Sequence, residues 1–239
     1  MKNNSTGTLY IVATPIGNLE DMTLRAIRIL KEVSVIASED TRVTRNLLKH
    51  YEISTKLISY HSHASASEHE RIIKILESGS DVALVSDAGT PAISDPGVLL
   101  VAEVYKRFGN DARVVPIPGA SAVISALSAS GLPASEFHFY GFLPHKKGRE
   151  TIFKQIAETE TTVAFYESTH RIEKALESLA KYLPENREVV IGRELTKHFE
   201  EFIRGTPAEV IATFKEHTDH ARGEFVVMVG SSVSLSRKK

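Results

Sequence analysis

The chain has 239 residues, a formal net charge of −1 and no cysteine. The absence of cysteine excludes disulfides, thiolate nucleophiles and cysteine-ligated metals. Because the charge is nearly balanced, any site for a polyanion must come from local clusters among the 29 Lys and Arg. No apolar run approaches the length of about 18 residues that a membrane helix needs, and the N-terminus has no signal-peptide apolar region. We therefore expect a soluble, cytoplasmic protein of one large or two medium domains.

The first half alternates short apolar strands with amphipathic helices. The expected strands are Leu9–Ala13, Val33–Ala37, Lys56–Tyr60, Val82–Val85 and Arg113–Pro116. The expected helices are one capped by Asp21 or Thr23 with Leu24, Ile27 and Leu30 on one face, one carrying Val43, Leu47 and Tyr51, one begun by a Ser67–Glu70 capping box, and Val98–Phe108. This alternation predicts an α/β fold with a parallel sheet and helices on both of its faces.

A proline-glycine break at residues 116–119 predicts a boundary between domains 1–119 and 120–239. Beyond it we expect strands at Phe137–Phe142, Thr162–Tyr166, Glu188–Arg193 and Glu224–Val229, and helices at Ser121–Ser130, Thr169–Tyr182 and Pro207–His217. The second domain is therefore predicted to be mixed α/β.

The segment Leu84–Gly97, LVSDAGTPAISDPG, is the most informative stretch of the chain. A buried strand runs into a loop rich in glycine and proline, residues that allow close backbone approach to a ligand and hold a loop in one shape. Open α/β sheets bind ligands at the carboxyl ends of their strands. An ordinary strand–helix connection is the alternative. We expect Asp87 to contact a ligand and Asp95 to shape the turn.

Other patterns point less clearly to a site. The turn Thr14–Asn18 lacks the spacing of a phosphate loop or of a dinucleotide-binding loop. His61 and His63, with Glu68 and His69 nearby, could bind zinc, but no second ligand set follows, and a surface or hydrogen-bonding role is favoured.

Charged groups follow the second strand and a later loop. Glu39, Asp40 and Arg42, with Arg45, stand at the same predicted sheet edge as the Pro15 and Asp87 loops, although Asp40 or Thr41 could equally cap a helix. The run His145–Arg149 is the densest basic segment and is either a solvated connection or a phosphate-contacting arm. Ser121 could cap a helix, place its hydroxyl against a ligand, or do both.

Taken in order, these stretches resemble the tetrapyrrole methylase superfamily, the class III S-adenosylmethionine-dependent methyltransferases. More narrowly, the chain is similar to the small-subunit ribosomal RNA methyltransferase I family. The matching segments are LYIVATPIGNLEDMTLRA from Leu9, SEDTRVTRNLL from Ser38, LVSDAGTPAISDPG from Leu84, VPIPGASA from Val115, FYGFLP from Phe139, FYESTHRI from Phe165, GRELTK from Gly192, RGT from Arg204 and GEFVVMV from Gly223.

The resemblance implies 2′-O-methylation of a cytidine ribose in the decoding region of 16S ribosomal RNA. It further implies a homodimer that needs no metal, with S-adenosylmethionine in a cleft between the two domains. The implied cofactor contacts are Pro15, Asp87, Gly89, Thr90, Ile93, Ser121, Ala122, Phe142, Tyr166 and Glu167.

Two departures from the family pattern concern the acceptor side. After Tyr60 the family has Tyr-His-Glu-His-Asn-Glu, whereas this chain has His61-Ser62-His63-Ala64-Ser65. Thr169 replaces the proline that usually follows FYES. In longer family members a helical C-terminal extension follows, and the resemblance implies that it supplies part of the RNA-binding surface there.

Methyl transfer to a ribose hydroxyl needs aligned reactants and a group that accepts the hydroxyl proton. The candidate bases are Glu39 and His61, with Asp40 less favoured because it could cap a helix. The candidate phosphate contacts are Arg42, Arg45, Lys146, Lys147 and Arg149. Two alternatives remain, namely a methylase of a tetrapyrrole or another small molecule, and a non-catalytic module that binds RNA or the ribosome.

Overall fold

The computed structural model describes residues 6–61 and 65–232. The chain divides into two compact units, Met1–Ser121 (unit 1) and Ala122–Lys239 (unit 2). The predicted domain boundary, between residues 119 and 120, lies two residues before this division. No helix in the described ranges is long and apolar enough to cross a membrane.

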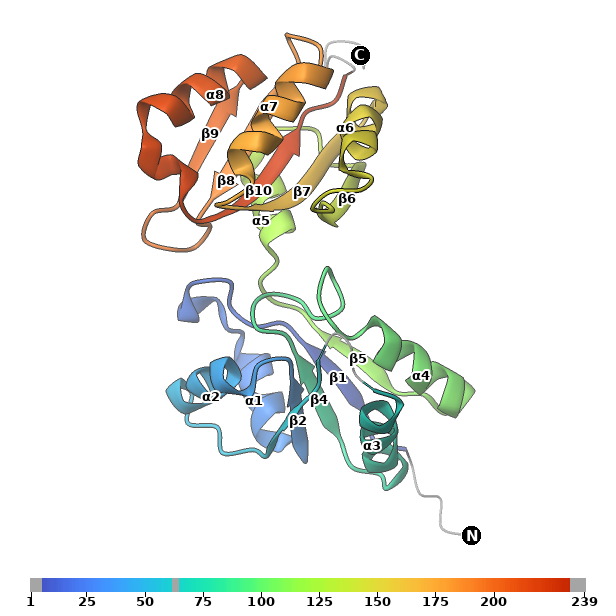
Figure 1. Cartoon of the computed structure of the whole chain (residues 1–239). Helices are drawn as coiled ribbons and strands as arrows, with labels where there is room; N and C mark the ends of the chain where they lie inside the picture. Colours follow the sequence, from blue (N-terminus) through green and yellow to red (C-terminus); the bar gives the residue numbers. More distant parts are fainter. Residues whose placement is uncertain (1–5, 62–64, 233–239) are drawn as a thin grey trace. The chain divides into compact units, whose positions relative to one another are not determined.

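Unit 1 is built on a five-stranded sheet in the order β3-β2-β4-β1-β5 (Figure 1). All of its strand pairs are parallel, as the alternation of strands and helices predicts. The strands are β1 (Leu9–Val12), β2 (Val35–Ser38), β3 (Leu57–Ser59), β4 (Val82–Val85) and β5 (Val114–Ile117), and two 3₁₀ turns lie at Leu19–Asp21 and Gly109–Asp111.

Each face of this sheet has its own apolar core, because successive strand side chains point to opposite faces. Leu84 packs with α3 (Ala66–Glu77) and α4 (Val98–Phe108). Ala83, its neighbour in β4, packs on the other face with α1 (Leu24–Glu32) and α2 (Thr41–His50). Helices therefore cover both faces, which confirms the predicted architecture of this unit.

Three helix details differ from the predictions. Leu24 is 87% exposed and Val43 is also exposed, since α1 buries Ala26, Ile29 and Leu30 and α2 buries Thr44 and Leu48. The capping box of α3 is formed by Ser65 and Glu68, two residues earlier than predicted. The sequence contains two overlapping Ser-x-x-Glu patterns, and the earlier one lets the helix begin at Ala66. Thr23 caps α1, as one of the two predicted alternatives.

Unit 2 contains a second five-stranded sheet, in the order β6-β7-β10-β8-β9 (Figure 1). Only the β6–β7 pair is parallel, so the strand directions in this sheet are mixed, and the unit as a whole is α/β as predicted. The strands are β6 (Phe137–Phe142), β7 (Thr162–Ser168), β8 (Val189–Arg193), β9 (Glu201–Gly205) and β10 (Glu224–Val229). The helices are α5 (Ala122–Ser130), α6 (Arg149–Glu158), α7 (Ile172–Tyr182) and α8 (Pro207–Glu216), with a 3₁₀ turn at Thr218–Ala221.

The helices of unit 2 lie on both faces of its sheet. The main core joins Phe153 of α6, Leu176 of α7 and Phe214 of α8 to one face. On the other face α5 contacts β7, β8 and β10. There Gly192 of β8 packs next to α5, and the position of a Cβ atom on it lies at an ordinary contact distance of 3.5 Å from the Ala126 Cβ atom. Neither α6 nor β9 is predicted by the pattern of the sequence.

Candidate active site

The loops at the carboxyl edge of the first sheet meet where its connections change direction. The connection that follows β1 runs through α1 on one face of the sheet, whereas the connection that follows the neighbouring strand β4 runs through α4 on the other face. Ligands of open α/β sheets bind at the carboxyl ends of two such strands, which is called the topological switch point. Thr14 and Gly89 bridge the two loops, each N–H donating to the other's carbonyl at 2.9 and 3.0 Å. The Thr90 hydroxyl donates to the Ala120 carbonyl at 3.1 Å. The predicted loops at Pro15, Asp87 and Ser121 therefore converge within unit 1.

The β4–α4 loop, residues 86–97, has an unusual backbone shape. Ala92 and Ser94 have positive φ values of 69° and 60°, in the region that side chains disfavour. Gly97 has φ 134°, and a Cβ atom there would lie 2.7 Å from the Leu84 Cδ2 atom. Non-glycine residues persist in this region only when their surroundings hold them there. The conformation of this loop, at the carboxyl edge of the sheet, is therefore held in place by the residues around it.

Three carboxylates lie at this edge, and two of them have a raised pKa. Burial, a hydrogen bond from Ser86 that acts the other way, and the charges of Glu39 and Asp87 together bring the pKa of Asp95 to about 6. Burial and the charge of Asp87 raise the pKa of Glu39, against the opposing effect of His61. Asp87 accepts a hydrogen bond from the Asp40 N–H at 3.0 Å. The cluster makes this edge of the sheet electronegative, and such an edge favours a cation or a proton.

The other predicted bases differ in how far they are engaged. Asp40 caps α2 through the Arg42 N–H at 2.8 Å and pairs with the Arg42 guanidinium at 2.7 Å, so the pKa of Asp40 is held well below its usual range. His61 is exposed, and its Nε2 atom lies 2.6 Å from the Ser59 hydroxyl. Asp40 is therefore a poor base, whereas the exposed His61 imidazole is hydrogen-bonded, among the described residues, only to the Ser59 hydroxyl.

A buried hydroxyl completes this edge. Ser38 is the last residue of β2 and is fully buried, and its hydroxyl has no hydrogen-bond partner among the described residues. Burying a polar group without a partner costs free energy. Ser38 is not among the predicted site residues, because a serine at the end of a strand belongs to no recognisable motif. Its position between the strand and Glu39 is the only feature of the sequence that could have pointed to it.

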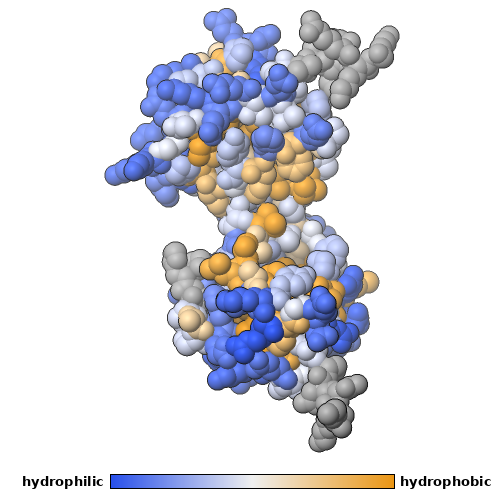
Figure 2. All heavy atoms as spheres, turned by 90° about the vertical axis from the view of Figure 1, so that its right-hand side faces the viewer, coloured by the Kyte–Doolittle hydropathy of each residue, from blue (hydrophilic) through white to orange (hydrophobic). Residues whose placement is uncertain are grey.

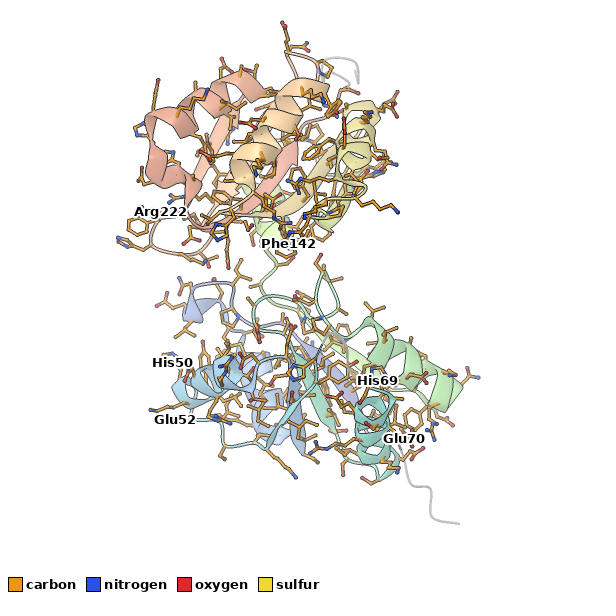
Figure 3. All side chains as sticks on the ribbon, viewed as in Figure 1. His50, Glu52, His69, Glu70, Phe142 and Arg222 are labelled. Carbon is orange, nitrogen blue, oxygen red and sulfur yellow. The ribbon has the colours of Figure 1, made fainter. Side chains whose placement is uncertain are left out.

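In unit 2 the predicted cofactor residues gather at the ends of β6 and β7. The Phe142 and Tyr166 rings are 5.3 Å apart, and the Val123 N–H donates to the Tyr166 hydroxyl at 3.3 Å, next to Ala122. The Phe142 side chain is 57% exposed at the end of its strand (Figure 3). This end of the second sheet therefore presents an aromatic surface.

Glu167 is fully buried between two arginines. Its carboxylate pairs with Arg149 at 2.7 Å and with Arg171 at 2.8 Å. The same guanidinium groups donate to the Pro144 and Leu143 carbonyls, which fixes the start of the β6–α6 loop. Arg149, expected at a phosphate, is thus bound to a carboxylate within its own unit. In the basic run, Lys146 and Lys147 remain exposed.

Other predicted residues lie apart from these groups. Arg45 lines a shallow hollow with Lys49, Ile53 and Leu57, at the connection that leads into β3. Ile93 is exposed in the β4–α4 loop, close in sequence to the exposed Val98 and Leu99 of α4; hydrophobic surface among charged residues is visible on unit 1 in Figure 2. His63 lies outside the described residues. Among the described residues, no group of three His, Asp or Glu could hold a metal.

Comparison with known proteins adds independent findings. The Tetrapyrrole (Corrin/Porphyrin) Methylases family matches residues 8–211. Ribosomal RNA small subunit methyltransferase I of Halalkalibacterium halodurans is 52% identical over 224 residues, covering 93% of this chain and 75% of that protein.

Solved structures resemble the fold. A cobalt precorrin-4 methyltransferase superposes with a TM-score of 0.67 at 18% identity, covering 96% of this chain and 97% of the other. Uroporphyrin-III C-methyltransferase from Thermus thermophilus, complexed with S-adenyl homocysteine, gives a TM-score of 0.61 at 18% identity, covering 94% and 97%.

Proposed function

This chain belongs to the tetrapyrrole methylase family, and from that membership we propose that it methylates the 2′-hydroxyl of a cytidine ribose in 16S ribosomal RNA. It is a methyltransferase that uses S-adenosylmethionine. The observation that carries the proposed acceptor is the 52% identity to a ribosomal RNA small subunit methyltransferase over 93% of this chain. The tetrapyrrole enzymes share only 18% identity and so support the fold rather than a tetrapyrrole substrate.

The carboxyl edge of unit 1 fits the cofactor chemically. S-adenosylmethionine carries a positive sulfonium and a positive ammonium group, and the Glu39, Asp87 and Asp95 carboxylates are negative groups suited to such a ligand. The buried Ser38 hydroxyl, which has no hydrogen-bond partner among the described residues, can form a hydrogen bond with a ligand at this edge. We infer that Pro15, Gly89, Thr90, Ile93, Ser121 and Ala122 line the cofactor, together with Phe142 and Tyr166. Glu167 acts only indirectly, because its buried carboxylate is paired with Arg149 and Arg171.

The bound cofactor supplies an activated methyl group with a neutral thioether as the leaving group. The protein must align the ribose hydroxyl with that methyl group and accept its proton. Glu39 suits this role because its raised pKa makes it a stronger base than an ordinary carboxylate. His61 is the second candidate, and Asp40 is the least suited because Arg42 already holds its charged form.

Recognition of the RNA is proposed to use local cations. Lys146 and Lys147 are exposed in a loop whose start is fixed by the Arg149–Glu167–Arg171 ion pairs. Arg42 is also exposed, at the start of α2, although it pairs with Asp40, and Arg45 lies on the same helix. In this arrangement Arg149 positions the basic loop rather than contacting a phosphate. We further propose a homodimer that acts in the cytoplasm on rRNA or the small ribosomal subunit.

Single-turnover methylation of small ribosomal subunits tests the role of Glu39. At saturating S-adenosylmethionine, so that any loss of cofactor affinity does not enter the rate, we expect Glu39→Gln to slow methyl transfer by about 100-fold or more. Glu20→Gln, at an exposed site in the same unit, is the matched control. Normal rates for both Glu39→Gln and His61→Ala would remove both proposed bases.

Two further measurements test the activity itself. Isothermal titration with S-adenosylmethionine separates a methyltransferase from a non-catalytic RNA-binding module, because only the former must bind the cofactor. Mass spectrometry of rRNA from a deletion strain should show one ribose methylation missing. A complete modification profile would refute the proposed rRNA substrate.

A further inference from the structure

The loop between β8 and β9, residues 194–200, has a strained backbone. Glu194 and Thr196 have positive φ values of 48° and 65°, although the loop contains no glycine. Each such residue costs about 1 kcal/mol or more. A loop that is kept in this shape must be held by its contacts.

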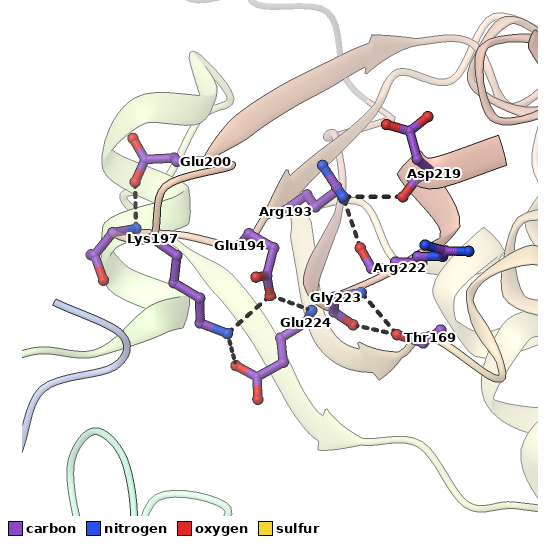
Figure 4. Close-up of polar contacts among 10 residues, drawn as sticks. Thr169, Arg193, Glu194, Lys197, Glu200, Asp219, Arg222, Gly223 and Glu224 are labelled. Atoms are coloured by element: carbon purple, nitrogen blue, oxygen red, sulfur yellow. Dashed lines mark hydrogen bonds and ion pairs between the residues drawn. The ribbon is translucent and has the colours of Figure 1, made fainter. Parts of the chain in front are cut away.

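Side-chain ion pairs supply those contacts (Figure 4). The Glu194 carboxylate accepts hydrogen bonds from Lys197 Nζ and from the Glu224 N–H, both at 2.9 Å. Lys197 Nζ also pairs with the Glu224 carboxylate at 2.9 Å. The Thr196 N–H donates to the Glu200 carboxylate at 2.5 Å. The charged groups of the loop are thus directed at one another and at β10.

The residues that pack against the β8–β9 loop leave room for the Glu194 side chain. A Cβ atom on Gly223 would lie 2.6 Å from the Glu194 Cγ atom, so only glycine fits there. The Thr169 hydroxyl donates to the Gly223 carbonyl at 2.8 Å and accepts from the Gly223 N–H at 2.9 Å (Figure 4). Thr169 is the residue that stands where the family pattern has proline. Its hydroxyl therefore fixes Gly223 directly under the strained loop.

The loop displays two aromatic rings that its bracing does not use. His198 and Phe199 are both exposed, with ring centroids 4.8 Å apart in an edge-to-face arrangement. The Phe199 side chain is 66% exposed. Among the described residues of unit 2, only Ile124, Phe142 and Phe199 are large apolar side chains with this degree of exposure. The Phe199 ring does not belong to the apolar core of unit 2 and is available to a ligand.

The strand register brings these rings to the same edge of the sheet as Phe142. Phe142 pairs with Tyr166 near the end of β7, Ser168 pairs with the start of β10, and Phe225 of β10 pairs with the end of β8. The β6–α6 and β8–β9 loops therefore leave one edge, three strand spacings or about 14 Å apart. Arg222, the exposed residue before Gly223, lies at this edge as well (Figure 3).

We propose that His198 and Phe199 form a platform on which an unpaired nucleobase of the RNA stacks, with Arg222 and the lysines of the β6–α6 loop beside the backbone. Single-stranded RNA is recognised by aromatic stacking combined with nearby cations. This inference rests on the proposed RNA substrate. The strained, braced loop holds the rings in place before the RNA arrives, which lowers the ordering cost of binding.

A second copy of the chain is a less suitable occupant of this surface. A stable protein interface needs about 800 Å² on each partner with an apolar centre. Phe199 is instead flanked by the charged Lys197, Glu200 and Glu201. Two exposed rings among charged residues suit a base better than they suit the apolar centre of a protein interface.

Steady-state methylation of small ribosomal subunits from a deletion strain tests the platform. We expect Phe199→Ala to raise the KM for subunits about 5- to 150-fold, since stacking on one ring contributes that much to affinity. The kcat and the Kd for S-adenosylmethionine should not change, because the ring is not assigned to the chemistry. Phe199→Tyr should restore a near-normal KM, and Tyr105→Ala, an exposed aromatic on α4, is the matched control.

The outcomes separate this inference from the function on which it rests. If the wild-type protein methylates the subunits and Phe199→Ala leaves KM unchanged, the platform is refuted while the proposed function stands. A loss of kcat, or a change in molar mass on light scattering that accompanies the KM effect, would also refute it in favour of a structural or dimer role. If the wild-type protein transfers no methyl group to RNA, the proposed function itself fails.

Discussion

The β4–α4 loop of unit 1 and the β8–β9 loop of unit 2 each hold two non-glycine residues in the left-handed backbone region. They are secured by different forces. The first is held by backbone contacts, namely the Thr14–Gly89 bridge and the Ala92 N–H bonded to the Pro96 carbonyl at 3.1 Å. The second is held by ion pairs among Glu194, Lys197 and Glu224.

This difference has consequences for what each loop tolerates. A backbone-braced loop depends on small residues that allow close packing, so it should be sensitive to added side-chain volume and insensitive to salt. A loop braced by partly exposed charges should tolerate volume changes but respond to the loss of one charge and to ionic strength. Substitutions in each loop can therefore test whether the two are really held differently.

The largest effect is expected from Gly97→Ala in the β4–α4 loop. The added Cβ atom would sit 2.7 Å from the Leu84 Cδ2 atom in a backbone with φ 134°. Overpacking and backbone strain together should lower the free energy of unfolding by about 3 kcal/mol. Denaturant unfolding measures this loss, and titration should show weaker binding of S-adenosylmethionine.

Gly109→Ala is the control for Gly97→Ala. Gly109 also has a positive φ, 53°, but no atom lies within 4 Å of the position of its Cβ. The Gly109→Ala variant should lose only about 1 kcal/mol of unfolding free energy, because it has the backbone strain of a positive φ but no steric clash. Equal losses at the two glycines would mean that the β4–α4 loop is not tightly packed.

A smaller effect is expected from Lys197→Met in the β8–β9 loop. Burial lowers the pKa of Lys197, but its bonds to Glu194 and Glu224 outweigh this and raise that pKa overall. Removing the ammonium leaves Glu194, whose side chain is only 18% exposed, without its cation. We expect unit 2 to lose about 1–2 kcal/mol of stability in chemical denaturation.

The exposed pair of Lys106 and Glu103 on α4 provides the comparison for Lys197→Met. Lys106→Met should cost less than about 0.5 kcal/mol, because surface ion pairs contribute little. Raising the ionic strength from about 0.05 to about 0.5 M should narrow the gap between wild type and Lys197→Met. A gap that does not respond to salt would argue against an ionic brace.

The same difference explains what could be predicted from the sequence. The existence of the β4–α4 loop was predictable because the segment contains glycines and prolines, whose backbone preferences are intrinsic. The positive φ values of Ala92 and Ser94 were not predictable, because these residues have no such preference. The parallel sheet was predictable because Val82–Val85 and the strands beside it are buried on both faces and read as continuous apolar runs.

The β8–β9 loop could not be predicted in this way. Glu194 and Thr196 have no intrinsic preference for positive φ, and their shape depends on Lys197, Glu224 and Gly223, of which the last two are distant in sequence. Likewise, β9 is an edge strand with polar residues, and Arg149 looks like a free cation until Glu167 is placed beside it. These features arise from tertiary contacts, which a local pattern does not contain.

The smallest predicted effect is a pH dependence that should differ between the two loops. Burial, together with Glu39 and Asp87, raises the pKa of Asp95 in the folded protein to about 6, from an ordinary value of 3.8. The folded state therefore binds this proton more tightly than the unfolded state does. The resulting stabilisation is complete below about pH 3.8 and is lost as the pH rises through 6.

Asp95→Asn should remove this loss of stability at high pH, because asparagine does not ionise. At pH 7.5 we expect the variant to be about 1 kcal/mol more stable than the wild type, allowing for partial solvent screening, with the difference shrinking toward pH 4. Its affinity for S-adenosylmethionine should fall, because the variant lacks one of the three negative groups proposed to suit the positively charged cofactor. Calorimetric unfolding between pH 4 and 7.5 measures the first effect, and Asp111→Asn, on the surface of the same unit, is the control.

The ion pairs of the β8–β9 loop should show no change over that range. Burial acts to raise the pKa of Glu194, but the hydrogen bonds from Lys197 and from the Glu224 N–H outweigh it and lower that pKa. The contribution of Glu194 to the stability of the fold is therefore present above its ordinary pKa of 4.5 and is lost only in acid. The raised pKa of Lys197 keeps its contribution in place up to the ordinary value of 10.5 and beyond. Hydrogen exchange of the two loops between pH 5 and 8, corrected for intrinsic rates, should therefore show opening that varies with pH near Gly89 and stays constant near Thr196. The same pH response in both loops would mean that a single charge network, and not two separate braces, controls them.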